Sequence, residues 1–220
     1  MTDGRDIRNS RARNDVSTGA RDVLTGARDV SAGRRADINI VLYKDFTALD
    51  VFGPVEVLGD VDDFRLRYVS LEGGIITNRQ SIRLETEPFA TVARGQIVLV
   101  PGGFGSRKSI KDERFIAALR QLVDDADCVL CVCTGSALVA ETGALDGRIA
   151  TTNTRAFDWV ADGHPAVEWV RGARWVTDGK YYTSAGVSAG IDMALGFVGD
   201  RYGLAAARDI AERMEYRWDE

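Results

Sequence analysis

Cys133 is the residue whose type and position best suit nucleophilic chemistry. It follows an apolar run of strand length, Val129 to Val132, and precedes a polar step and a short helical segment. A strand-to-helix turn with small residues around it can present a nucleophile above a sheet, and the positive end of the helix favours a thiolate. Free cysteine is also among the most buried residue types, so the local pattern equally allows Cys133 to be a core residue.

The other two cysteines, Cys128 and Cys131, are predicted to lie in the core. Along an extended strand their spacing spans roughly 10 Å, which exceeds the roughly 7 Å between Cα atoms that a disulfide tolerates. The sequence has no second C-x-x-C and a single histidine, His164, which is expected in an exposed loop. We therefore expect no zinc or other metal site.

Asp50 could exchange a proton with such a thiol. It precedes a stretch with helical spacing of apolar residues, and proline is tolerated only near a helix start. Pro54 therefore predicts that the helix begins at Phe52 or Gly53, with Asp50 in the turn before it. The local pattern favours a helix-capping role for Asp50, and Glu56 is a rival acid.

A glycine pair, Gly102 and Gly103, follows the apolar run 97–100. Glycine lets a ligand approach the backbone, so these N–H groups could bind an oxyanion, although glycine-rich turns after strands are common without that role. Neither G-x-x-x-x-G-K nor G-x-G-x-x-G occurs, which argues against a phosphate cradle.

Alternating strands and helices must position these groups. The pattern predicts strands at 38–43, 64–71, 97–100, 129–132 and 149–152, and hairpins formed by 75–77 with 81–84 and by 174–176 with 180–183. It predicts the other helices at about 112–125, 134–142, 157–160, 190–197 and 204–216. This order indicates an α/β fold with a doubly wound, mostly parallel sheet and helices on both faces. Ligands of such folds bind at the carboxyl ends of strands. That edge gathers Asp50, Gly102, Gly103, Cys133, Thr134, Asn153, Ser184 and Gly186.

The composition restricts the class of protein. The chain has 220 residues, 45% of them hydrophobic, which fits one domain with a sizeable core. A net charge of −5 gives no general attraction to nucleic acid or anionic membrane, so a small molecule is the expected partner. We expect neither a membrane helix nor a signal peptide, and the three cysteines suit a reducing compartment, the cytoplasm.

Residues 1–36 differ from the rest of the chain. They are rich in Arg, Asp, Gly, Ser and Thr, and three similar heptads begin at Asp15, Asp22 and Asp29. Each heptad repeats only one apolar position, which is too few for a coiled coil. We predict a disordered, solvated tail, or a start placed too far upstream, followed by a single catalytic domain over 37–220.

The order of four motifs resembles a known superfamily. The chain carries LDVFGPVEVL from Leu49, VPGGFG from Val100, CVCTGSALVAETGALDGRIATTN from Cys131 and TSAGVSAGIDMAL from Thr183. Together, over about 37–216, they resemble the PfpI-like superfamily of class I glutamine amidotransferase folds. Within it they are most similar to the isonitrile (isocyanide) hydratases and to the sensor domains of AraC-type regulators.

The resemblance implies roles for particular residues. It implies that Cys133 is the nucleophile, that Thr134 is the threonine beside it, and that Asp50 is the catalytic acid in preference to Glu56. It also implies a homodimer. Protease-like and glyoxalase-like members carry a histidine where this chain has Thr134 or Asn153, which disfavours deglycation or glyoxalase activity. Hydratase relatives often have histidine at the Asn153 position, and the regulators continue into a helix-turn-helix domain, whereas this sequence stops at Glu220.

Two hypotheses follow. In the first, the protein hydrates an isocyanide to an N-substituted formamide without a cofactor: Cys133 forms a thioimidate, Asp50 transfers protons, and Thr134 orients Asp50. The N–H groups of the glycine turn and of residue 134 hold the polar intermediate, and Asn153, Ser184 and Gly186 line the substrate pocket. In the second, the protein is a non-catalytic small-molecule-binding or redox-sensing module with an exposed cysteine of low pKa.

Overall fold

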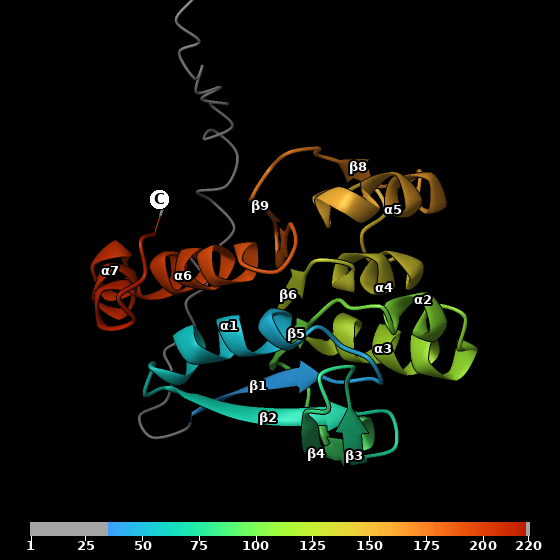
Figure 1. The fold of residues 1–220 in the computed structure, drawn as a ribbon, viewed down its shortest axis with the longest axis horizontal. Coiled ribbons are helices and arrows are strands. Elements are labelled where there is room, and N and C mark those ends of the chain that lie inside the picture. Colours follow the sequence, from blue (N-terminus) through green and yellow to red (C-terminus); the bar gives the residue numbers. More distant parts are fainter. Residues whose placement is uncertain (1–34, 219–220) are drawn as a thin grey trace, which may run out of the picture.

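A mostly parallel sheet forms the centre of the molecule (Figure 1). The computed structural model describes residues 35–218. The sheet runs in the order β3-β4-β2-β1-β5-β6-β10-β9. Its parallel centre is formed by β4 (Arg83–Pro88), β2 (Phe64–Ser70), β1 (Ala36–Val41), β5 (Ile97–Val100), β6 (Cys128–Val132) and β10 (Tyr181–Ser184). The edge strands β3 (Gly74–Thr77) and β9 (Trp175–Asp178) pair antiparallel to their neighbours.

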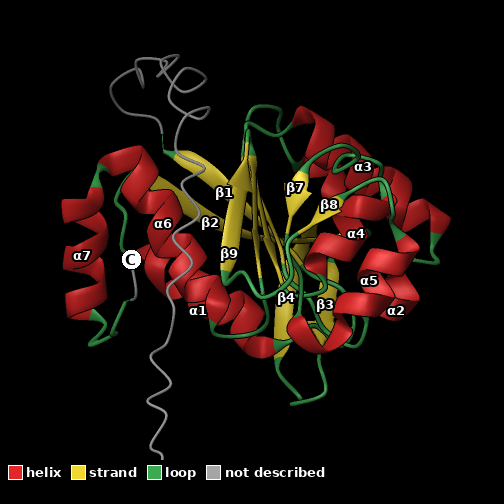
Figure 2. Cartoon of the chain, turned by 90° about the horizontal axis from the view of Figure 1, so that it is seen from above, coloured by secondary structure: helices red, strands yellow, loops and turns green. Residues whose placement is uncertain are grey.

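Helices cover both faces of this sheet (Figure 2). One face carries α1 (Ala48–Gly59), α6 (Ala189–Tyr202) and α7 (Leu204–Arg213). The other carries α2 (Ser106–Ser109), α3 (Glu113–Asp125), α4 (Gly135–Glu141) and α5 (Phe157–Gly163). A small parallel pair, β7 (Ile149–Ala150) and β8 (Glu168–Trp169), and two 3₁₀ turns, Phe89–Thr91 and Thr154–Ala156, complete the described elements. The predicted α/β class is confirmed.

The continuous apolar runs of β5 and β6 follow from this layered arrangement. Side chains alternate between the two faces, and helices cover both, so every position is buried. Leu99 and Leu130 join the core under α1 and α6, whereas Val98 and Val129 join the core under α3 and α4. Cys128 and Cys131 are free, buried strand residues, which confirms their prediction as core.

The predicted start of α1 is wrong. The helix begins at Ala48 and includes Pro54, so Asp50 lies in its first turn and not in the loop before it. Packing against α6 explains why the proline is tolerated: a Cβ on Gly53 would lie 2.8 Å from Ile191 Cγ1, and a Cβ on Gly190 would lie 3.3 Å from Pro54 Cγ. This close contact outweighs the local cost of an interior proline.

Several other boundaries differ by a few residues. The strand predicted at 149–152 stops at Ala150, the last helix ends at Arg213, and the short elements α2 and β8 had no sequence signal. Residues 1–34, most of the predicted tail, lie outside the described part of the chain, and β1 begins at Ala36, one residue before the predicted domain start. None of the described helices is both long enough and apolar enough to cross a bilayer.

Candidate active site

Cys133 lies immediately after β6, at the carboxyl edge of the sheet. Its backbone is left-handed, with φ +58°, a region that residues with a Cβ rarely adopt. The Cys133 N–H donates to the carbonyls of Ser184 and Ala185 at 3.1 and 3.2 Å, and the Thr152 hydroxyl donates to the Cys133 carbonyl at 3.1 Å. These bonds hold the turn, and only 6% of the residue is exposed.

Asp50 is fully buried beside this turn. Its Oδ2 accepts the Gly102 N–H at 3.0 Å, while Oδ1 has no partner of ordinary hydrogen-bond geometry within the described structure. Burial raises the pKa of Asp50 to about 6, although the Gly102 N–H, the Cys133 thiol and the Val187 N–H each act to lower it. The sulfur contact is thus looser than an ordinary hydrogen bond but close enough to affect the charge on the carboxylate.

The thiol has the opposite protonation preference to the one predicted. Burial, and next the nearby Asp50 carboxylate, raise the pKa of Cys133 to about 12, and the Thr134 N–H and the Asn153 amide offset this only in part. The helix that follows the cysteine, α4, has only seven residues, and the positive charge at its N-terminal end does not outweigh burial and the Asp50 charge. The resting pair is therefore a protonated thiol beside a carboxylate.

The glycine turn supports these two residues rather than presenting free amides. The Gly102 N–H is bound to Asp50, and the Gly103 N–H donates to Thr134 Oγ1 at 3.1 Å. The Ser106 hydroxyl also donates to Thr134 Oγ1, at 3.0 Å. This corrects two predicted roles: the amides of Gly102 and Gly103 do not face an oxyanion, and Thr134 anchors the glycine turn instead of orienting Asp50.

The fit of the turn requires glycine at position 102. A Cβ there would lie 2.6 Å from the Thr134 backbone nitrogen and 2.8 Å from Cys133 Cβ. Such a close approach lets the Gly102 amide reach Asp50 and keeps the carboxylate beside the sulfur.

Asn153 approaches the thiol from another side. Its Oδ1 accepts the N–H groups of Arg155 and Ala156, each at 3.0 Å, so the side-chain nitrogen is turned toward Cys133 and Gly186. A Cβ on Gly186 would lie 2.1 Å from Asn153 Nδ2 and 3.8 Å from Cys133 Sγ. Asn153 and Gly186 therefore form the wall beside the sulfur.

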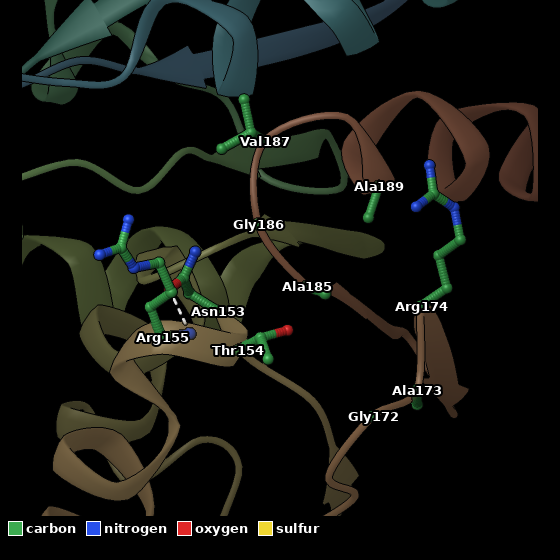
Figure 3. Close-up of a pocket in the computed structure, with 10 residues that line it drawn as sticks. All are labelled: Asn153, Thr154, Arg155, Gly172, Ala173, Arg174, Ala185, Gly186, Val187 and Ala189. Atoms are coloured by element: carbon green, nitrogen blue, oxygen red, sulfur yellow. Dashed lines mark hydrogen bonds between the residues drawn. The ribbon is translucent and has the colours of Figure 1, made fainter.

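A pocket of about 400 Å³ opens next to this wall (Figure 3). Asn153 and Gly186 line it, together with Arg155, Arg174 and other residues of the same loops. Ser184 does not line it: its side chain is fully buried, and its hydroxyl donates to the Cys131 carbonyl at 3.3 Å. The predicted pocket role of Ser184 is therefore replaced by a structural one.

Three other residues at the site were not predicted from the sequence. Val187 has a left-handed backbone, φ +59°, which directs its N–H toward Asp50. Ser106 supports Thr134, and the buried Tyr43 hydroxyl donates to the Pro101 carbonyl at 2.8 Å behind the glycine turn. No local pattern marks these contacts because their partners are distant in sequence. Within residues 35–218, no group of three or more His, Cys, Asp or Glu side chains is arranged to hold a metal ion.

Comparisons with known proteins agree with this fold. Residues 36–199 match the model of the DJ-1/PfpI family. Isonitrile hydratase from Pseudomonas putida is 30% identical over 181 residues, which cover 81% of this chain and 78% of the hydratase. The HTH-type transcriptional regulator CdhR from Pseudomonas aeruginosa is 26% identical over 184 residues, 81% of this chain but only 54% of the regulator. The crystal structure of a ThiJ/PfpI family protein from Pseudomonas syringae superposes with a TM-score of 0.77 at 26% identity, covering 84% of this chain and 77% of that one.

Proposed function

This chain belongs to the DJ-1/PfpI family, and we propose that it hydrates an isocyanide, R–N≡C, to an N-substituted formamide, R–NH–CHO. The observation that carries the proposal is the pair formed by Cys133 and Asp50. A buried thiol on a left-handed turn lies against a buried carboxylate whose pKa is raised to about 6. Similarity to the hydratase of Pseudomonas putida supports the choice of reaction.

The first step is addition of the thiol to the terminal carbon of the isocyanide. The Asp50 carboxylate accepts the thiol proton while the sulfur–carbon bond forms, and it then donates that proton to the same carbon. The product is a thioimidate, R–N=CH–S–Cys133. A pKa near 6 suits this transfer, because Asp50 is ionised at neutral pH yet basic enough to accept a proton.

Water then completes the reaction. Asp50 accepts a proton from water as the oxygen bonds to the thioimidate carbon, and it then donates that same proton to the nitrogen, which leaves R–NH–CH(OH)–S–Cys133 and an ionised Asp50. Collapse of this adduct breaks the carbon–sulfur bond, releases the formamide and returns the remaining proton to Cys133. One isocyanide and one water are consumed, and the enzyme is restored.

The neighbouring residues act by positioning. The Gly102 N–H fixes one carboxylate oxygen of Asp50 and leaves Oδ1 for proton transfer. The Asn153 amide lowers the pKa of Cys133 and so stabilises negative charge on the sulfur as the proton leaves. Thr134 holds the glycine turn through Gly103. We further propose that the reaction needs no cofactor and that the protein acts as a cytoplasmic homodimer.

The alternative is a binding or redox-sensing module. Similarity to the regulator CdhR supports small-molecule binding. Redox sensing requires an accessible thiolate, whereas Cys133 is 6% exposed and has a raised pKa. A buried carboxylate beside the thiol also has no role in simple binding, which favours the enzyme.

Turnover of a simple alkyl isocyanide tests the proposal. Purified protein should accumulate formamide well beyond one equivalent, and Cys133→Ala and Asp50→Asn should each abolish it. Cys128→Ala and Glu56→Gln are matched controls, since Cys128 is a buried strand thiol and Glu56 is an exposed acid on the same helix as Asp50. Stoichiometric modification of Cys133 without product would reject the enzyme and support the binding module. Activity that survives either active-site change would reject the assigned roles.

A further inference from the structure

The pocket beside Cys133 has a positive lining. Its lining residues include two arginines, Arg155 and Arg174, and no aspartate or glutamate. Figure 3 shows the two arginines on opposite sides of the pocket, with Asn153 next to Arg155. The other lining residues are mostly glycine and alanine, so there is room for a group larger than the isocyanide carbon. The two charges are not equivalent.

Arg174 is neutralised by its own surroundings. Its Nε forms an ion pair with Asp192, which is only 1% exposed. The Tyr216 hydroxyl donates to the same carboxylate at 2.9 Å, and Ser188 lies 3.5 Å from the guanidinium. Arg174 therefore pairs with a buried carboxylate and, although its own side chain is half exposed, forms one wall of the pocket with its charge already compensated.

Arg155 has no such compensation. Its backbone N–H binds Asn153 Oδ1, but its guanidinium has no ion pair, hydrogen bond or aromatic contact with any residue between 35 and 218. The backbone bond fixes the start of this side chain beside Asn153, whose amide contacts the nucleophile. An uncompensated cation in a pocket without acidic side chains attracts a negative group.

We propose that the ligand of this pocket carries an anionic group, a carboxylate in the simplest case, that Arg155 binds while the reacting carbon meets Cys133. Arg155 is then a specificity-determining residue that distinguishes an isocyano carboxylate from a neutral isocyanide. The reaction named here rests on the proposed function, whereas the preference for an anion rests on the pocket alone.

Paired probes of similar size and different charge test the inference. The first assay compares kcat/KM for short isocyano carboxylates, beginning with isocyanoacetate and increasing in chain length, with kcat/KM for their methyl esters. The second compares the rates at which iodoacetate and iodoacetamide alkylate Cys133, followed by mass spectrometry. Because both alkylating agents react with the same sulfur, their rate ratio cancels any change in thiol ionisation. The second assay needs no turnover.

Three variants show whether the preference for anionic probes depends on the charge of Arg155. Arg155→Gln should lower the preference for the anionic probe about three- to fivefold, the range of one partly exposed ion pair. Arg155→Lys should keep most of it, because the charge remains. Arg83→Gln is the matched control and should behave as the wild type, since Arg83 is an exposed residue of β4, at the opposite side of the sheet from β9 and β10.

The outcomes separate the two claims. If Arg155→Gln changes neither ratio at any chain length, the anionic preference is wrong, even if neutral isocyanides are hydrated. If no isocyanide is turned over but the alkylation ratio falls in Arg155→Gln, the proposed reaction is wrong and the anion-binding pocket stands. If Arg83→Gln has the same effect as Arg155→Gln, the preference comes from overall charge, and the assignment to Arg155 fails.

Discussion

The Cys133 thiol lies against the Asp50 carboxylate, and the proton stays on the sulfur. Burial together with the carboxylate raises the pKa of the thiol to about 12, whereas burial raises that of Asp50 only to about 6. At neutral pH the negative charge is therefore on oxygen. The catalytic proton needs no exchange with solvent before the sulfur attacks, because its acceptor is already in place.

The pH dependence of turnover follows from this pair. The active form has Asp50 ionised and Cys133 protonated, so kcat/KM should rise through an apparent pKa near 6 and stay level through the neutral and mildly alkaline range. Formamide production measured across this range in buffers of constant ionic strength checks the profile. A maximum on the acidic side would mean that the protonated carboxyl is required, which contradicts the proposed order of proton transfers.

Asp50 should cost the protein stability above pH 6. Its folded pKa, about 6, exceeds the ordinary 3.8, so folding disfavours the ionised form. The cost is absent at low pH, where the carboxyl is protonated in both states, and is complete above the folded pKa. Asp50→Asn, which has no charge to bury, should therefore be more stable at pH 7.5 by about 1 to 3 kcal/mol, and this gain should vanish near pH 3, below the unfolded pKa. Urea unfolding of both proteins at the two pH values measures it, and an equal difference at both would contradict the burial argument.

Gly186→Ala should misplace Asn153. The added Cβ would lie 2.1 Å from Asn153 Nδ2, so the amide must move away from Cys133. We expect kcat to fall by about tenfold or more, because a shift of about 1 Å at a reacting group is costly. Gly163→Ala is the control, since nothing lies within 4 Å of a Cβ there and its φ is not left-handed. Equal activity of the two variants would show that the wall beside the sulfur is not needed.

Thr134→Val should destabilise the glycine turn, whereas Thr134→Ser should not. Valine has a similar shape but leaves the buried Gly103 N–H without its acceptor, which costs about 1 to 3 kcal/mol. Serine keeps the oxygen that Gly103 and Ser106 both contact. Thermal unfolding and formamide production of the two variants give the comparison. Serine as damaging as valine would mean that the methyl group, not the hydrogen bond, matters.

The parts of this site that follow a strand could be predicted from sequence. Continuous apolar runs revealed β5 and β6, and the change of polarity after Val132 placed Cys133 at the edge of the sheet. The same rule placed the Gly102 turn beside it. These predictions succeed because a strand buried on both faces leaves a pattern that does not depend on its neighbours.

Contacts between distant segments could not be predicted. Pro54 gave a strong local signal for a helix boundary, yet packing of α1 on α6 moved the start to Ala48 and took Asp50 into the helix. The elevated pKa of Cys133 depends on burial and on the Asp50 carboxylate of α1, which is distant in sequence, so the prediction of a thiolate from the helix end alone was wrong. The sequence placed Ser184 correctly at the carboxyl edge of the sheet, but it did not show which way the side chain points. The hydroxyl points into the protein and donates to the Cys131 carbonyl.

The left-handed backbone of Cys133 also has an evolutionary consequence. Glycine would occupy φ +58° at lower cost than any residue with a Cβ, so a chain released from catalysis would gain stability by losing this cysteine. A duplicated gene whose product only binds a ligand could therefore replace this cysteine by glycine, and the protein would become more stable without forming any new contact. Cysteine at this backbone angle lowers the stability of the fold, so we expect it to persist only where selection acts on the reactivity of the thiol.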